Sequence, residues 1–181
     1  MSEDGRYYGK YRGSVFNNID PENRARIQAY VPDVFGTTPT SYALPCLPVT
    51  GDGSGAFFVP EIGAGVWIEF EQGDRDYPIW SGGFWGSTSE LPQTGRTSLP
   101  FAPNIVLQTS GSNSVTVYGD ETSGVTISAG EVGPSSPSIS VAPDSIVIQC
   151  GASKITIASG SISIDAATIS LNDPALVVTK A

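Results

Sequence analysis

The sequence predicts an all-β protein built from two modules, a small antiparallel barrel followed by a stacked array of short strands. Three observations lead to this class. Apolar residues alternate with polar ones through most of the 181 residues, which is the period of a strand. Gly and Pro, 21 and 14 in number, punctuate the alternating segments. The composition also changes: residues 1–100 hold 7 of the 9 Lys and Arg and all three Trp, whereas Ser and Thr dominate residues 101–181.

The first module, within residues 7–92, begins with a strand and a turn. Residues 11–16 alternate and carry a glycine, Gly13, that marks a bulge or bend. Asp20 and Pro21 predict a turn, because Asp suits the first turn position and Pro presets φ at the second.

The remaining strands of this module follow at unequal intervals. Residues 26–31 alternate, and the proline that follows ends the strand because it cannot donate to a ladder. A Gly- and Ser-rich loop at 51–55 leads to strands at 66–71 and 77–83, joined by a turn at Gly73-Asp74. About five short strands close most economically into a barrel, since closure removes exposed edges.

The second module is an internal repeat of apolar-polar-apolar triplets rich in β-branched residues. The triplets occupy residues 115–117, 125–127, 139–141, 146–148, 155–157, 162–164 and 169–171. The last units begin at 146, 155, 162, 169 and 176, and residues 129–138, with Pro134 and Pro137, interrupt the repeat. The alternation predicts strands with one buried face, and the repetition predicts a stacked architecture.

The step size favours three chains wound together. A lone column of such strands would bury little surface and leave its edges open, whereas three chains supplying one strand per face pair those edges with one another. The predicted axial core consists of Ile146, Ile148, Ile155, Ile157, Ile162, Ile164, Ile169 and Leu171. The alternatives are a monomeric solenoid that binds glycans or ice, and a disordered tail, which the regular alternation disfavours.

Several motifs of the first module share the order and spacing of a known family. They are Tyr11-Arg12-Gly13, Asp20-Pro21, Arg26, Val31-Pro32-Asp33, Pro60-Glu61-Ile62-Gly63, Val66-Trp67-Ile68-Glu69-Phe70, Gly73-Asp74, Pro78-Ile79-Trp80 and Gly83. This set resembles the OB-fold domain of phage baseplate assembly protein V, of phage cell-puncturing spikes, and of valine-glycine repeat spikes of type VI secretion. Ala25 departs from the pattern, because many relatives place a Gly before the Arg.

The resemblance implies the organisation and the role of the chain. An OB-fold domain over 1–92 attaches to a trimeric baseplate hub, 93–103 form a linker, and 104–181 form a triple-stranded β-helix needle in a homotrimer. The chain is then the central spike of a phage tail or phage-tail-like particle, driven through the target envelope on sheath contraction. The linker has no room for the lysozyme domain that some spikes insert there.

The C-terminal end of the needle is expected to bind a second protein. Three chains ending together leave a blunt platform with open strand edges and apolar side chains, which invite a partner. By the same resemblance, that partner is a small conical tip protein of the proline-alanine-alanine-arginine repeat kind. It would contact Pro174, Leu176, Val177 and Val178.

The composition argues against an enzyme or a metal protein. The chain has no histidine, which excludes Ser-His and Cys-His nucleophile pairs and most zinc and iron sites, and no cofactor is expected. Glu69 and Glu71, expected on one strand face, are the best catalytic pair, but such a pair on a wet face is ordinary. Asp74 and Asp76 are interpreted as parts of a solvated turn.

The charge argues against nucleic acid. The net charge is −9, and phosphate binding needs clustered cations. The alternative function is an OB-type binding module for a glycan or a nucleic acid, which needs a basic groove with stacking aromatic residues. The one candidate cluster, residues 6–12, is better interpreted as strand-start or hub-facing. Cys46 and Cys150 are expected to be free thiols packed as small hydrophobes.

The sequence also predicts where the chain is made. No apolar run reaches the roughly 20 residues that span a bilayer, and residues 1–5 are polar and acidic, unlike a signal peptide. We therefore expect synthesis in the cytoplasm, residence in a baseplate, and contact with a membrane only by mechanical penetration.

Overall fold

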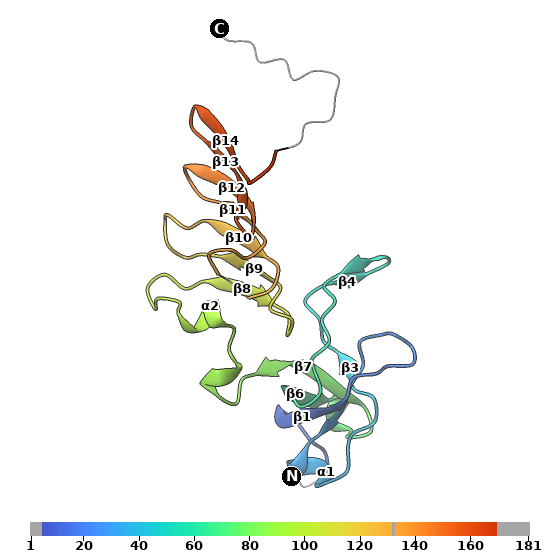
Figure 1. The fold of residues 1–181 in the computed structure, drawn as a ribbon. Coiled ribbons are helices and arrows are strands. Elements are labelled where there is room, and N and C mark those ends of the chain that lie inside the picture. The colour runs from blue at the N-terminus through green and yellow to red at the C-terminus, as the bar shows by residue number, and fades with distance from the viewer. Residues whose placement is uncertain (1–4, 132, 170–181) are drawn as a thin grey trace. The chain divides into compact units, whose positions relative to one another are not determined.

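The computed structural model describes residues 5–131 and 133–169, and the chain divides after Glu90 into two compact units (Figure 1). Strands dominate both units. The helices are short, and they are α1 (Pro32–Phe35), η1 (Glu71–Gly73), η2 (Thr88–Glu90) and α2 (Gln93–Arg96). None of the helices in these ranges is long and apolar enough to cross a membrane.

A five-stranded sheet forms the first unit. Its strands, in spatial order, are β2 (Gln28–Tyr30), β1 (Tyr11–Asn17), β6 (Gly65–Phe70), β7 (Pro78–Phe84) and β3 (Leu44–Pro45). Neighbouring strands are antiparallel except for β3, which runs parallel to β7. The strands expected at residues 11–16, 26–31, 66–71 and 77–83 are therefore present.

The sheet closes on itself through the segment that precedes β3. Ile27 and Ala43 exchange backbone hydrogen bonds of 3.2 and 2.7 Å, and Thr40 N–H donates to the Ala29 carbonyl oxygen at 2.8 Å. These bonds join the outer edge of β2 to the chain leading into β3. The result is the small barrel that the sequence predicts, with its edges paired.

The barrel interior is filled by alternate residues of these strands. The largest side chains without solvent contact include Ile27, Val31, Val66 and Ile68. The buried cluster consists of Val15, Ile27, Ala29, Val31, Ala43, Val66, Ile68, Phe70 and Trp80. Period-two alternation places these residues on one side of each strand, so the predicted inward faces of residues 27–31 and 66–70 are confirmed.

Two local expectations for this unit are corrected. The bulge of β1 lies between Val15 and Asn17 rather than at Gly13. Gly13 instead permits a close approach, because a Cβ there would lie 2.9 Å from the Tyr30 carbonyl oxygen. Strand β6 ends at Phe70, so Glu71 lies in η1 and does not share a strand face with Glu69.

A short arm leaves the barrel between β3 and β6. Strands β4 (Thr50–Gly51) and β5 (Ser54–Gly55) pair as a two-stranded hairpin apart from the five-stranded sheet (Figure 1). The sequence predicts a loop over residues 51–55, so the hairpin is a correction. Asp52 and Gly53 supply the turn between the two strands, with Gly53 at a φ of 63°.

The second unit contains one seven-stranded antiparallel sheet in which each strand pairs with its sequence neighbours (Figure 1). The strands are β8 (Ile105–Gln108), β9 (Ser114–Val117), β10 (Val125–Ser128), β11 (Ser138–Val141), β12 (Ser145–Cys150), β13 (Ser153–Ala158) and β14 (Ser161–Asp165). The triplets from residue 115 to residue 164 all lie in these strands. Within the described residues, strands β9 to β13 therefore pair on both sides inside one chain, whereas the sequence predicts that strand edges pair with neighbouring chains.

The proline-containing interruption does not break the sheet. Ser128 of β10 pairs with Ser138 of β11, so the two strands meet directly on either side of the intervening loop. Ala129 N–H donates to the Pro137 carbonyl oxygen at 2.9 Å, and Gly151 N–H donates to the Ser135 carbonyl oxygen at 3.0 Å. The described residues of this interruption therefore lie beside the ladder, whose register is unchanged.

Candidate functional site

One face of the seven-stranded sheet carries two unbroken columns of aliphatic side chains. The cross-strand registers align them without a gap from β8 to β14. The first column is Ile105, Val117, Val125, Val141, Ile146, Ile157 and Ile162, and the second is Leu107, Val115, Ile127, Ile139, Ile148, Ile155 and Ile164. We call this surface the aliphatic face.

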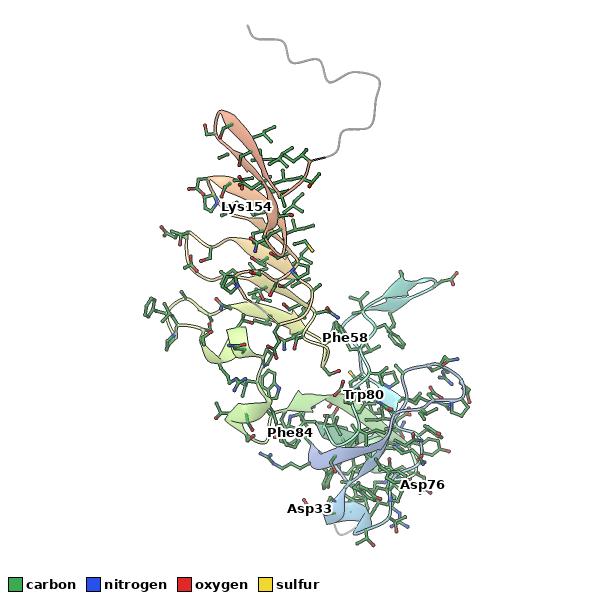
Figure 2. All side chains as sticks on the ribbon, viewed as in Figure 1. Asp33, Phe58, Asp76, Trp80, Phe84 and Lys154 are labelled. Atoms are coloured by element: carbon green, nitrogen blue, oxygen red, sulfur yellow. The ribbon has the colours of Figure 1, made fainter. Side chains whose placement is uncertain are left out.

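The aliphatic face is open to solvent in the single chain. Apart from Val125, its side chains have exposed fractions between 37% for Ile155 and 70% for Ile162. Figure 2 shows the side chains projecting in rows from these strands. A contiguous apolar surface of this kind marks an interaction site, because its contact with water is unfavourable.

The opposite face of the sheet is mainly hydroxyl-bearing and less exposed where β8–β10 lie. Thr116 and Ser128 are 2% and 5% exposed, and Thr126 Oγ1 lies 3.1 Å from Ser140 Oγ in the neighbouring strand. In the single chain, the polar face of β9 and β10 is therefore less exposed than the aliphatic face. A further chain that covers the aliphatic face would bury the apolar side chains as well.

Burial of the aliphatic face has a substantial energy. Complete burial of a Val, Leu or Ile side chain contributes about 1.5–3 kcal/mol. Because these side chains are already partly covered, the remaining gain is about 1 kcal/mol each. Summed over two columns, this gain can offset the entropy lost on association.

Most of the predicted axial residues lie on the aliphatic face. Ile146, Ile148, Ile155, Ile157, Ile162 and Ile164 occupy adjacent positions on β12, β13 and β14. Ile169 follows the last strand and is 50% exposed. Leu171 lies outside the described residues, as do the proposed tip contacts Pro174, Leu176, Val177 and Val178.

The sequence repeat did not identify the first two members of the aliphatic face, Ile105 and Leu107. Both are more than half exposed, and they pair with Val117 and Val115. Their triplet has Val106 at its centre, where most other triplets have Ser or Thr. The alternation of exposed and less exposed residues along β8 identifies Ile105 and Leu107 as members, whereas the polarity of the central residue does not.

The N-terminal aromatic and basic cluster is engaged by the barrel itself. Tyr7 and Tyr11 pack against Phe70 with ring centroids 5.9 and 5.5 Å away. Lys10 Nζ lies 3.0 Å from a carboxylate oxygen of Glu69, and Arg6 donates to the Gln72 carbonyl oxygen at 2.7 Å. This agrees with the interpretation of residues 6–12 as strand-start residues.

Carboxylates in the first unit have structural surroundings. Asp20, whose side chain is 4% exposed, accepts a 2.7 Å ion pair from Arg26 and backbone N–H bonds from Glu22, Arg24 and Arg26. The Arg26 guanidinium, followed by these backbone donors, holds the pKa of Asp20 well below its usual range. This carboxylate organises the turn.

The remaining polar candidates are also placed. Asp74 closes a turn by accepting the Asp76 N–H at 3.0 Å, as expected. Both Cys46 and Cys150 are free but exposed, so the expectation that they pack as small hydrophobes is wrong for the single chain. Within residues 5–131 and 133–169, no group of three or more His, Cys, Asp or Glu could hold a metal ion.

Comparison with protein-family models finds two matches. Residues 11–85 match the type VI secretion system/phage-baseplate injector OB domain, which covers the barrel. Residues 104–177 match the phage baseplate V C-terminal trimerisation domain, which covers the seven-stranded sheet and the aliphatic face. Together they account for most of the chain. No curated protein matches the sequence.

Proposed function

The chain belongs to the phage baseplate V family, and from this premise we propose that it is the central spike that pierces the target envelope when a contractile sheath shortens. The trimerisation domain supports self-association as a homotrimer. The observation that carries the proposal is the aliphatic face, which continues through all seven strands.

The mechanism follows from packing three aliphatic faces around a common axis. Each copy supplies one wall of antiparallel strands, the two aliphatic columns meet inside, and the hydroxyl-bearing face points away from the axis. Strands β9 to β13 are hydrogen-bonded on both sides, which makes each wall stiff. A stiff rod transmits an axial force without any chemical step.

We assign a separate role to each of the two matched domains. We place a hub-attachment domain over residues 1–92, a linker over 93–103 and the needle over 104–181. The barrel has a closed edge and its own core, which suit it to a fixed position on a trimeric baseplate hub. The chain is then a component of the baseplate of a virion or of a phage-tail-like particle.

The tip of the needle is assigned to a second protein of the conical proline-alanine-alanine-arginine repeat kind. Strand β14 is an edge strand of the described sheet, and its residue Ile162 is 70% exposed. Capture of the tip protein by the full chain, but not by a chain ending at Asp165, is the expected result. Equal capture by both chains places the tip contact elsewhere.

The piercing role is tested in the native particle with a shortened needle. A chain ending at Ser128 retains the barrel and strands β8 to β10. Particles carrying it should still contract, as counted in electron micrographs, but should depolarise target cells much less than particles with the full chain, because strands β11 to β14 of the needle are absent. Equal depolarisation by contracted particles of both kinds would remove the piercing role.

A further inference from the structure

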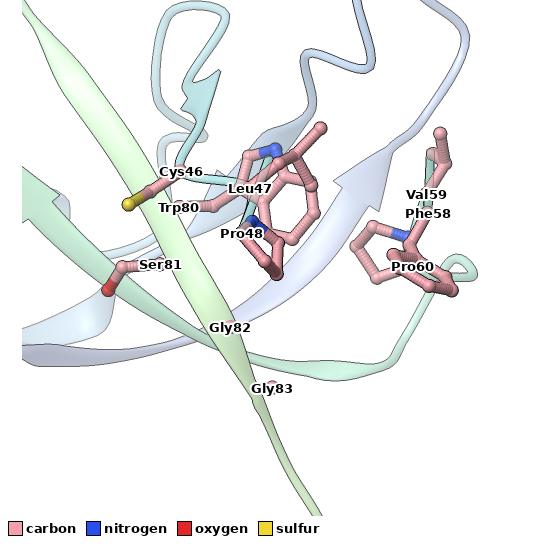
Figure 3. A pocket seen from close by; sticks show the side chains of 10 residues that line it. All are labelled: Cys46, Leu47, Pro48, Phe58, Val59, Pro60, Trp80, Ser81, Gly82 and Gly83. Atoms are coloured by element: carbon pink, nitrogen blue, oxygen red, sulfur yellow. The ribbon is translucent and has the colours of Figure 1, made fainter. Parts of the chain in front are cut away.

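An apolar pocket opens at the base of the arm in the first unit. Its volume is about 440 Å³, and it is lined by residues 46–48, by residues 58–60, which form its two walls, and by β7 from Trp80 to Gly83 (Figure 3). The walls are the outgoing and returning segments of the chain that carries the β4–β5 hairpin. The pocket therefore belongs to a single unit and is built by the arm.

The floor of the pocket is free of side chains at two positions. Gly82 and Gly83 lie on β7, and a Cβ added at Gly82 would have no atom within 4 Å. Strand β7 therefore presents bare backbone beside the rings of Trp80 and Phe58, both labelled in Figure 2. This shape accepts an apolar side chain that approaches from outside.

The arm offers such a side chain. Phe57 is 68% exposed and is not part of the pocket wall, whereas its neighbour Phe58 lines it. Val49, on the outgoing segment, is 61% exposed. One chain thus carries both an exposed aromatic anchor and an apolar pocket.

The low charge of the arm and the pocket wall favours a second copy of this chain as the partner. Residues 44–60 contain one charged residue, Asp52, although each chain carries a net charge of −9. Copies of this chain repel one another except where they meet through an uncharged surface. The arm and the pocket together provide that surface.

The trimeric state supplies proximity and symmetry. Strand β7 ends at Phe84, and the second unit, which holds the trimerisation domain, begins at Leu91. Three first units are therefore tethered close to one another, which raises their effective concentration. A contact between different surfaces of identical chains closes into a ring when the symmetry is cyclic.

We propose that, in the homotrimer, Phe57 of each copy enters the pocket between residues 46–48, 58–60 and β7 of the next copy. Three equivalent contacts then form a ring of barrels. The ring holds the first units in a fixed arrangement independently of the aliphatic face. This inference rests on the trimer and not on the piercing role.

Cross-linking of the full chain tests the contact. Cys46 already lines the pocket, so Phe57→Cys in a Cys150→Ser background places one new thiol on the arm of a chain whose pocket keeps its native thiol. A short bismaleimide should convert most of the protein to covalent dimers and trimers on a boiled denaturing gel. The matched control is Tyr77→Cys in the same background, because Tyr77 is 64% exposed and does not line the pocket.

A second control identifies the partner thiol. The chain with Phe57→Cys, Cys46→Ser and Cys150→Ser should remain monomeric on the gel while light scattering still reports a trimer. The inference is wrong if the Tyr77→Cys control cross-links equally, if bands persist without Cys46, or if an intact trimer of the Phe57→Cys chain gives no inter-chain product. The last outcome would leave the pocket to a different partner, and it would not affect the piercing role.

Discussion

The indole Nε1–H of Trp80 donates a buried hydrogen bond of 2.9 Å to the backbone carbonyl oxygen of Ala25, 55 residues away in sequence. Trp80 belongs to β7 and Ala25 precedes β2, and the sheet order places β1 and β6 between these two strands. The bond therefore connects the turn that precedes β2 directly to β7. It also satisfies a carbonyl group that has little access to water.

Replacement of Trp80 by Phe should destabilise the first unit by about 1–3 kcal/mol, because the Ala25 carbonyl loses its donor in a buried position. Urea unfolding followed by tryptophan fluorescence measures this, since all three Trp lie in residues 1–90. The exposed Trp85→Phe is the matched control and should change stability by less than about 0.5 kcal/mol. Equal losses of stability in Trp80→Phe and Trp85→Phe would show that the Trp80–Ala25 hydrogen bond does not stabilise the first unit.

Ala25 has a φ of 60° and is 3% exposed, so its conformation favours glycine while its surroundings are packed. Ala25→Gly should be neutral or stabilising by up to about 1 kcal/mol, because relief of the left-handed strain exceeds or balances the added chain entropy. Ala25→Val should destabilise by about 2 kcal/mol or more, since branching at Cβ conflicts with this φ. Urea midpoints of both variants test the contrast, and similar midpoints would refute it.

The Asp20–Arg26 pair should make the first unit sensitive to acid. The pKa of Asp20 lies below its value of about 3.9 in an unfolded chain, so the unfolded state binds more protons between the two pKa values. The stabilisation is therefore complete above about pH 5 and is lost as the pH falls towards the folded pKa. Asp20→Asn should be less stable at neutral pH and should vary less between pH 5 and pH 2. Arg26→Gln should likewise reduce the change in the free energy of unfolding between pH 5 and pH 2. If both variants keep the pH dependence of the original chain, the Asp20–Arg26 pair is not the cause of that dependence.

Charges on the aliphatic face should prevent trimerisation. Ile155→Asp together with Ile157→Asp places carboxylates in both columns of β13, and an unpaired buried charge costs several kcal/mol. Thr156→Asp, on the opposite face of the same strand, is the control and should leave the trimer intact. The mass from light scattering separates the two. A soluble trimer of the double variant would exclude an axial position for these isoleucines.

A fragment of residues 1–92 should fold alone, because the barrel has its own core and closing hydrogen bonds. Its circular dichroism and dispersed NMR spectrum should match those of the first unit in the full chain. It should trimerise more weakly, since the aliphatic face is absent. An unfolded fragment would overturn the proposed domain boundaries.

The barrel was largely predictable because its signals are local. Alternating residues gave β1, β2, β6 and β7, and Pro32 and Gly73 marked where the chain turns. The closing contact between Ile27 and Ala43 and the Trp80–Ala25 bond join distant segments. No spacing rule predicts such contacts, because they depend on how the whole sheet curls.

The aliphatic face was predicted where its triplets have a polar centre and was missed at Ile105 and Leu107, where the centre is Val106. The pairing within one chain was not anticipated, because the edge argument considered separate strands rather than consecutive hairpins. The arm hairpin was interpreted as a loop, since a Gly- and Ser-rich segment has weak strand propensity. The pocket beside it depends on the tertiary position of Phe58 and β7, which sequence alone does not specify.

Because every strand of the seven-stranded sheet pairs only with its sequence neighbours, the needle can change length by whole hairpins. Insertion or removal of two consecutive strands preserves the chain direction and keeps both aliphatic columns aligned. Each such step alters the reach by about 9–10 Å, twice the spacing between strands. An odd number of strands would instead reverse the direction of the C-terminal segment. On the proposed piercing function, duplication or deletion of a hairpin in the gene is therefore a simple route to spikes that match envelopes of different thickness.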